Sequence, residues 1–198
     1  FELMVKEALE QGILPEFEIH HYGLPLKEFE KVKYDDLSRR IRDVGKEIKE
    51  LGHQKGIHDS NIIRRMQKLA NREDELGSLA RQHLYLTNQR KHLLYNSEAR
   101  QDAVLKILAE EVKEDPKTRA LLFHESIESV MQLYYQLLAA DYPVAVEHSQ
   151  LADSIRKASI ELFRDGTAQI IVSARSLIEG FNVPETDIGI IVASSTSV

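Results

Sequence analysis

The sequence contains no cysteine and no tryptophan. Without cysteine the chain can form no disulfide, no thiolate metal site and no cysteine nucleophile. No apolar run approaches the roughly 20 residues that a membrane-spanning helix requires, so we expect an intracellular protein without a membrane partner. The pattern G-x-x-x-x-G-K-[S/T] is also missing from these 198 residues, which excludes the phosphate-binding loop of P-loop NTPases.

The chain has no strong excess of basic residues, and its net charge of −6 hides an asymmetry. Residues 27–115 hold 19 basic and 17 acidic side chains, whereas the remaining residues hold 7 basic and 15 acidic ones. A phosphate backbone is therefore expected to contact the middle segment or a few local groups, and not a broad basic face.

Residues 27–115 have the pattern of a helical insertion. Apolar residues recur there at steps of three and four, which is typical of amphipathic helices. The two apolar stripes are Tyr34, Leu37, Ile41, Val44, Ile48 and Leu51, then Ile62, Met66, Leu69, Leu76 and Ala80, with Glu73 falling on the second stripe. We predict two long helices joined by a glycine-flanked loop as an antiparallel hairpin, and a third helix near residues 99–112. In residues 1–26 the pattern predicts a short helix over 3–14 and a strand over 15–26.

Residues 116–198 alternate between short apolar strands and amphipathic helices, which predicts an α/β fold with a parallel sheet and helices on both faces. The predicted strands are Leu121–Phe123, Val144–Val146, Gln169–Val172 and Gly189–Ala193. The last two are almost wholly apolar, so we expect them to be buried on both faces. A first helix is predicted from Ile127 to Ala140. A second helix is expected to point Ile155, Ala158, Leu162 and Phe163 inward and to stop at Asp165-Gly166.

Small polar residues follow three of these predicted strands. They form the segments His124-Glu125-Ser126, His148-Ser149 and Ser173-Ala174-Arg175. Ligand loops of such sheets lie at the carboxyl ends of the strands, where backbone N–H groups and helix N-termini suit a phosphate. The alternative is that Ser126 and Ser149 only cap the following helices, and that His148 is an ordinary loop histidine.

Taken in order, these segments resemble the second motor lobe of superfamily 2 helicases. Leu121 to Ser126 looks like helicase motif IV, and VEHSQLADSIRKASIELFRDG (Val146 to Gly166) is similar to the segment that follows it, with Arg156, Phe163 and Gly166 in place. SARSLIEGFNVPE (Ser173 to Glu185) looks like motif V. The likeness extends more loosely back to Phe17, where it resembles the XPB-like and restriction-subunit-like branches.

The resemblance implies roles for individual residues. Ser173 takes the place of the motif V hydroxyl that contacts a nucleic-acid phosphate, and Ser126, His148, Ser149 and Ala174 would contact the same strand. Gly180 and Asn182 would face ATP and Mg²⁺ held mainly by an N-terminal RecA-like lobe outside this chain. The family often has Asp at the position of Asn182, and Asn carries no charge. The arginine-bearing motif VI is expected after Val198, so we expect a truncated lobe with no catalytic residue and no ATPase activity by itself.

The parent protein is thus expected to be an ATP-dependent DNA helicase or translocase, with RNA as the alternative substrate. In the hairpin, Arg39, Arg40 and Arg42 are candidates to follow a phosphate backbone, or they line a solvated helical face. A rival interpretation is a non-catalytic module whose hairpin recruits a protein partner. Another α/β enzyme is disfavoured because no glycine-rich first turn follows the early strand. We predict no metal site. The acidic pair Asp74-Glu75 is not a Walker B motif, because it lies in a helical pattern.

Overall fold

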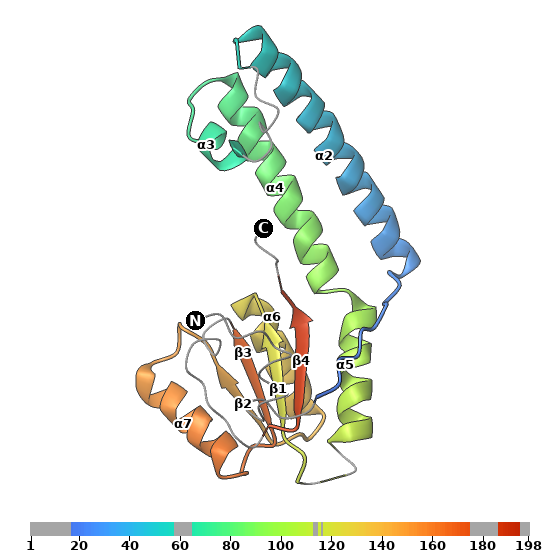
Figure 1. Cartoon of the computed structure of the whole chain (residues 1–198), viewed down its shortest axis with the longest axis vertical. Coiled ribbons are helices and arrows are strands. Elements are labelled where there is room, and N and C mark those ends of the chain that lie inside the picture. Colours follow the sequence, from blue (N-terminus) through green and yellow to red (C-terminus); the bar gives the residue numbers. More distant parts are fainter. Residues whose placement is uncertain (1–16, 58–64, 113–114, 116, 175–185, 195–198) are drawn as a thin grey trace.

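The computed structural model describes residues 17–57, 65–112, 115, 117–174 and 186–194. It has two parts: a parallel sheet flanked by helices, and a long helical hairpin that rises from one end of the sheet (Figure 1). The predicted helix over 3–14 lies outside the described residues. Within these ranges, no helix combines the length and apolar character needed to cross a bilayer.

The hairpin consists of α2 (Glu28–Gln54), the short α3 (Met66–Ala70) and α4 (Glu75–Tyr95). Its two long helices run antiparallel, as predicted (Figure 1). Their apolar stripes meet in one core whose buried members are Ile41, Val44, Ile48, Met66, Leu69, Leu76, Ala80 and Leu86. This closure explains the stripe, because each helix has only one apolar side to bury.

The spacing of the second stripe had predicted one continuous helix. The structure instead divides this stripe between α3 and α4. The chain turns between α3 and α4, and Glu73 is exposed in this turn and does not lie on the seam. Asp74 begins α4 by accepting a hydrogen bond from the Gly77 backbone N–H at 3.1 Å. Such a cap satisfies one of the unpaired N–H groups of the first helical turn. Asp74 therefore starts a helix and does not end a strand, which agrees with our rejection of a Walker B motif.

The sheet has four strands: β1 (Ala120–His124), β2 (Val144–Glu147), β3 (Ile170–Ala174) and β4 (Ile188–Ala193). Their order across the sheet is β2-β3-β1-β4, and every pair is parallel. The predicted α/β class and parallel sheet are confirmed.

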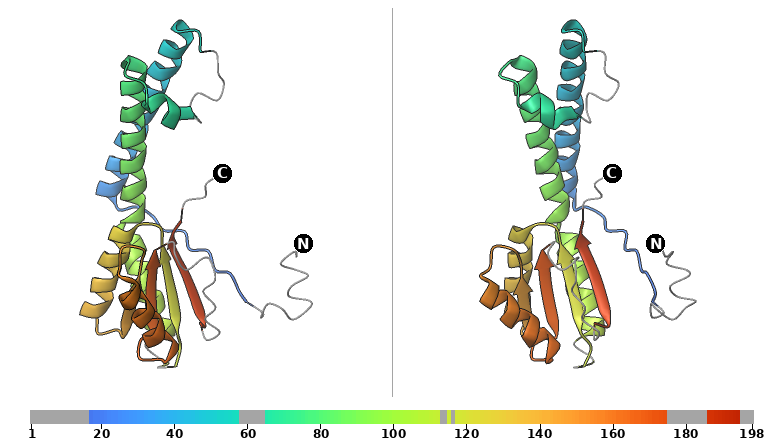
Figure 2. Two further views of the ribbon diagram at one scale, coloured as in Figure 1. Left: turned by 90° about the vertical axis from the view of Figure 1, so that its left-hand side faces the viewer. Right: turned by 60° about the vertical axis from the view of Figure 1, so that its left-hand side comes forward.

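Helices cover both faces of this sheet (Figure 2). On one face, α5 (Glu98–Glu111) and α6 (Ile127–Ala139) pack against alternate strand residues such as Leu122 and Val172. On the other face, α7 (Asp153–Arg164) places Phe163 against Ala145 and Ile171. The predicted insertion, 27–115, includes α5, although Val104 and Leu108 of this helix belong to the core of the sheet.

Two expectations about buried faces are wrong. In α7 the inward residues are Ser159 and Phe163, whereas Ile155, Ala158 and Leu162 are exposed. In β4, Ile191 has 72% of its surface exposed. The reason is that α7 packs mainly on β2 and β3, and β4 lies at the opposite edge of the sheet from β2.

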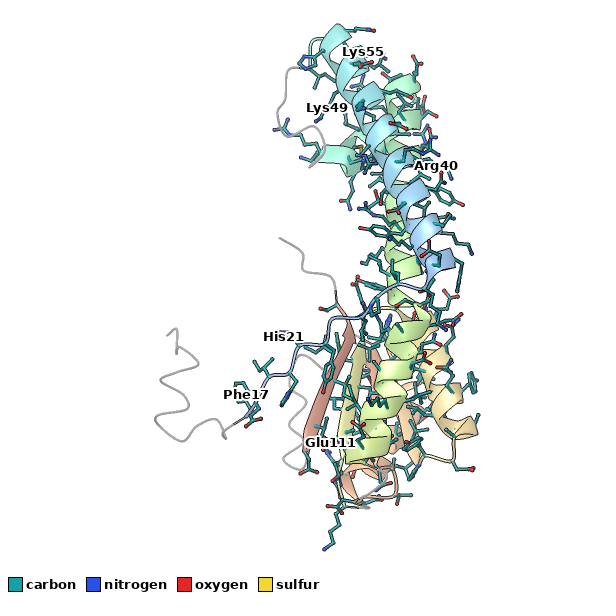
Figure 3. All side chains as sticks on the ribbon, turned by 90° about the vertical axis from the view of Figure 1, so that its right-hand side faces the viewer. Phe17, His21, Arg40, Lys49, Lys55 and Glu111 are labelled. Carbon is teal, nitrogen blue, oxygen red and sulfur yellow. The ribbon has the colours of Figure 1, made fainter. Side chains whose placement is uncertain are left out.

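The predicted strand over 15–26 is also wrong where the structure describes it. Residues 17–26 form no strand, and Phe17 and His21 lie on an extended segment outside the sheet (Figure 3). Phe17 and Ile19 are exposed at 52% and 68%. Alternation alone had suggested a half-buried strand, but here both sets of alternating side chains face solvent.

Candidate nucleic-acid interface

The predicted phosphate-binding residues gather at one edge of the sheet. Ser126 follows β1, His148 follows β2, and Ser173 lies near the end of β3. Ser173 pairs in register with Phe123 on one side and with Glu147 on the other, so the three strands end at the same level. This edge faces the base of the hairpin (Figure 1). Gly180 and Asn182 lie outside the described residues.

The two serines of the loops differ in what they do locally. Ser126 caps α6: its hydroxyl oxygen accepts a hydrogen bond from the Ser129 backbone N–H at 3.4 Å. Ser149 is exposed in a turn and does not cap α7, because the residue before that helix is Ala152. The capping role considered for both serines therefore holds for Ser126, whereas the Ser149 hydroxyl faces solvent at the carboxyl edge.

His148 is an unusual loop histidine. It is only 5% exposed, and neither of its ring nitrogens has a hydrogen-bond partner within the described part of the chain. A buried polar group without a partner costs free energy. A ligand oxygen or a bridging water at this edge would remove that cost.

Ser173 and Ala174 point into the protein. Ser173 is fully buried, and its hydroxyl donates a hydrogen bond to Glu147 Oε2 at 2.9 Å. Ala174 packs in the core beneath α5 and α6, which leaves its backbone as the part able to meet a ligand. For the Ser173 hydroxyl to bind a phosphate, it must first leave Glu147, whose charge repels a phosphate.

Glu147 is the centre of a buried polar network that the sequence pattern did not reveal. Its side chain has no exposed surface, and its Oε1 accepts a hydrogen bond from Arg156 Nε at 2.8 Å. Arg156 belongs to α7 and also lies 3.7 Å from Asp153. The pair joins α7 to the end of β2 and offsets the cost of burying the carboxylate. A lone acid at the end of the apolar run Val-Ala-Val was the available signal.

The loop after β1 is also supported from below. His124 is almost fully buried, and its Nδ1 accepts a hydrogen bond from the Ser126 backbone N–H at 3.0 Å. Burial lowers the pKa of His124 below its ordinary value, and the Arg100 guanidinium nearby acts in the same direction. The imidazole is therefore neutral at neutral pH, and it holds the backbone that presents Ser126.

The hairpin arginines lie on an exposed side of α2 (Figure 3 labels Arg40). Arg39 forms a hydrogen-bonded ion pair with Asp36 and lies 4.0 Å from Asp43. Arg40 lies 3.7 Å from Asp36. Arg42, two residues after Arg40 on the same helix, is also exposed. Local carboxylates thus reduce the positive field of two of the three arginines.

A groove of about 710 Å³ opens between α2 and α4 near the base of the hairpin. Apolar side chains from both helices, including Val32, Tyr85 and Leu93, line it together with polar ones such as Asn88 and Gln89. Tyr85 and Val32 are each 61% exposed. Among the residues that the structure describes, no group of three histidine or acidic side chains is placed to hold a metal ion.

Comparison with known proteins identifies the family. Residues 100–198 match the model of the helicase conserved C-terminal domain. The helicase domain of Hef from Pyrococcus furiosus has the same fold, with a TM-score of 0.62 at 15% identity over 93% of this chain and 51% of that one. The C-terminal part of the Fun30 ATPase domain gives a TM-score of 0.61 at 16% identity, over 92% of this chain and 77% of that one.

The matched region is half of the present sequence. The chain spans about half of the Hef helicase-domain structure. A search of curated protein sequences found no match. The family match and the shared fold agree with the resemblance drawn from the strand-end segments. The chain therefore belongs to the helicase conserved C-terminal domain family, and its sheet and flanking helices have the RecA-like fold.

Proposed function

We propose that this lobe grips the phosphate backbone of DNA in an ATP-driven helicase or translocase. The observation that carries the proposal is that Ser126, His148 and Ser149 lie just after the carboxyl ends of β1 and β2, the two parallel strands on either side of β3. Hydroxyl groups, imidazole nitrogens and backbone N–H groups bind phosphate without reading base sequence. Binding is therefore expected to be independent of sequence.

ATP enters the proposal through a second RecA-like lobe. The sequence of this chain has no Walker A loop to hold the phosphates. In the proposed motor, the other lobe binds ATP and Mg²⁺, and Gly180 and Asn182 of this lobe complete the nucleotide site. Cleft closure on ATP and reopening after hydrolysis would then move the DNA grip. By itself this chain is expected not to turn over ATP.

The direct test is ATP turnover with and without single-stranded DNA, measured on the full gene product and on the 198-residue chain. We expect DNA-stimulated turnover in the full protein and none in the chain. Turnover by the chain alone would contradict the division of roles, and a full protein that ignores DNA would contradict the motor itself.

Single substitutions then assign the grip. In the full protein, Ser173→Ala and Ser149→Ala should each weaken DNA stimulation more than ATP affinity. Ser154→Ala is a matched control on the exposed side of α7. Because Ser173 also bonds to Glu147, its variant needs an unfolding measurement beside the kinetics. If Ser149→Ala lowers stimulation and Ser173→Ala does not, Ser173 has only a structural role.

A second candidate function is recruitment of a protein partner by the hairpin. Two observations favour it: the groove with exposed Val32 and Tyr85, and the pairing of Arg39 and Arg40 with acids. Replacing Arg39, Arg40 and Arg42 by glutamate separates the two functions. A fall in DNA affinity supports a hairpin that follows DNA, whereas unchanged affinity supports protein recruitment.

A further inference from the structure

The base of the hairpin is bonded directly to the loop that carries Ser126. Glu125 precedes Ser126 and receives two hydrogen bonds from α4. Lys91 Nζ donates to Glu125 Oε1 at 2.6 Å, and the Tyr95 hydroxyl donates to Glu125 Oε2 at 2.5 Å. Lys91 and Tyr95 are one helical turn apart, so each oxygen of the carboxylate is held by a different turn of the same helix.

Further contacts continue this attachment. The Tyr95 ring meets the His124 ring edge-on, with the ring centres 5.3 Å apart. Beside it, the Ser129 hydroxyl of α6 donates a hydrogen bond to Asn96 Oδ1 at 2.9 Å. We call these contacts the hairpin clamp, formed by Lys91, Tyr95 and Asn96 on the hairpin side and by His124, Glu125 and Ser129 on the sheet side.

The other leg of the hairpin has its own fixed point. Glu30 of α2 is 3% exposed, although it is an acid. Its Oε2 accepts from the Lys27 backbone N–H at 2.9 Å, and its Oε1 accepts from the Glu98 backbone N–H at 2.9 Å. One carboxylate thus satisfies the N-termini of both α2 and α5. Both legs of the hairpin are therefore attached at its base.

The electrostatics strengthen the clamp. The Glu125 side chain is 11% exposed, and that of Lys91 is 37% exposed. In such a partly dry setting an ion pair is stronger than at an open surface. The hydrogen bond to Glu125 is the main reason that the pKa of Lys91 lies above its ordinary value, so Lys91 stays charged throughout the neutral range.

We infer that Glu125 is a positioning residue that locks the hairpin to the strand-end loop, so that hairpin and loop move as one body. The lock itself follows from the contacts of Lys91 and Tyr95 with Glu125. Its consequence rests on the proposed function. A DNA strand held at Ser126 would fix the direction of the hairpin relative to the sheet, and a force on the hairpin would be transmitted to the loop that binds the DNA.

The sequence suits a distance measurement, because the chain has no native cysteine. Spin labels on Lys49→Cys in α2 and Lys157→Cys in α7 report the direction of the hairpin relative to the sheet. Both native lysines are exposed. Lys49 lies toward the far end of the hairpin (Figure 3). The labelled protein should give one narrow distance distribution. Adding Lys91→Met and Tyr95→Phe removes both donors but keeps the ring against His124, and we expect a broader distribution with a shifted mean.

The matched control makes the same two replacements away from the clamp, as Lys106→Met and Tyr135→Phe on exposed positions of α5 and α6. It should leave the distribution unchanged. If circular dichroism shows that the Lys91/Tyr95 variant does not fold, Glu125→Gln takes its place. If the folded Lys91/Tyr95 variant keeps the distance distribution of the parent protein, the proposal that Glu125 locks the hairpin is wrong. A lock that holds in a protein that fails to bind a single-stranded oligonucleotide instead overturns the proposed function.

Discussion

At the residue scale, the buried acid Glu147 has the clearest energetic role. It holds Arg156 of α7 and Ser173 of β3 at once. Glu147→Gln keeps the shape but removes the charge that these donors face, so we expect a loss of about 2 kcal/mol in the free energy of unfolding. Urea denaturation measures it. The control is Glu161→Gln, which removes an exposed pair with Arg164 and should cost less than about 0.5 kcal/mol. Equal losses in both variants would contradict this role.

Two buried histidines predict how stability depends on pH. Burial is the main reason that the pKa values of His83 and His124 lie below 6.5. Below 6.5 the unfolded chain therefore binds protons that the folded chain refuses, and stability falls with falling pH until the folded pKa is reached. The slope is at most about 1.4 kcal/mol per pH unit for each histidine.

Urea denaturation at a series of pH values from about 7.5 down to about 5 tests this effect. His124→Asn keeps an acceptor for the Ser126 N–H but does not titrate, so the slope should become shallower than in the parent. The carboxylates of Asp74 and Asp165 do not confuse the result, because their pKa values are lowered from 3.8 and act in a more acid range. An unchanged slope in the variant would show that His124 does not contribute.

The sequence predicted those residues of the site that a local pattern marks, but not the distant residues that support them. Ser126 and His148 follow apolar strands and Ser173 lies near the end of one, and parallel strands bring their ends together. The contacts that support them join distant positions: Lys91 lies 34 residues from Glu125, and Glu30 lies 68 residues from Glu98. Neither hydrophobic period nor turn chemistry encodes such pairs, so the structure was needed to find them.

At the element scale, the turn between α3 and α4 sets where the hairpin begins its return. Arg81 of α4 donates hydrogen bonds to the backbone carbonyls of Ala70 and Arg72, at 2.7 and 2.9 Å. Gly77 lies against the Arg72 carbonyl. A Cβ at residue 77 would stand 2.0 Å from the Arg72 carbonyl oxygen. The period of the stripe predicted the core residues Met66, Leu69, Leu76 and Ala80, but it could not show this backbone contact.

Gly77→Ala should therefore push α4 away from the turn, with a loss of about 1–3 kcal/mol in the free energy of unfolding. Thermal and urea denaturation followed by circular dichroism measure the loss. Gly23→Ala is the matched control, since a Cβ there meets no atom within 4 Å, and it should change stability by less than about 0.5 kcal/mol. If Gly77→Ala is as stable as this control, the close approach to Arg72 does not constrain the hairpin.

At the scale of the whole molecule, charge separates two ways of holding DNA. The described strand-end residues contribute hydroxyl, imidazole and backbone donors, and none of them is a lysine or arginine. The exposed side of α2 carries three arginines, of which Arg39 and Arg40 lie near carboxylates. Neutral donors release few counterions on binding, whereas each cation that neutralises a phosphate adds to the salt dependence.

The salt dependence of binding to a labelled single-stranded oligonucleotide therefore tells which surface is used. If the strand-end loops hold the DNA with no cation besides Arg175, which lies outside the described residues, the logarithm of the affinity should fall with the logarithm of the salt concentration with a slope no steeper than about −0.7. If Arg39, Arg40 and Arg42 each neutralise a phosphate, the slope should be about −2, at about −0.7 per contact. Replacing the three arginines by glutamine removes this slope only in the second case. We expect the shallow slope, because Asp36 and Asp43 compete with phosphate for the arginines, and a steep slope abolished by the triple variant would assign the grip to the hairpin.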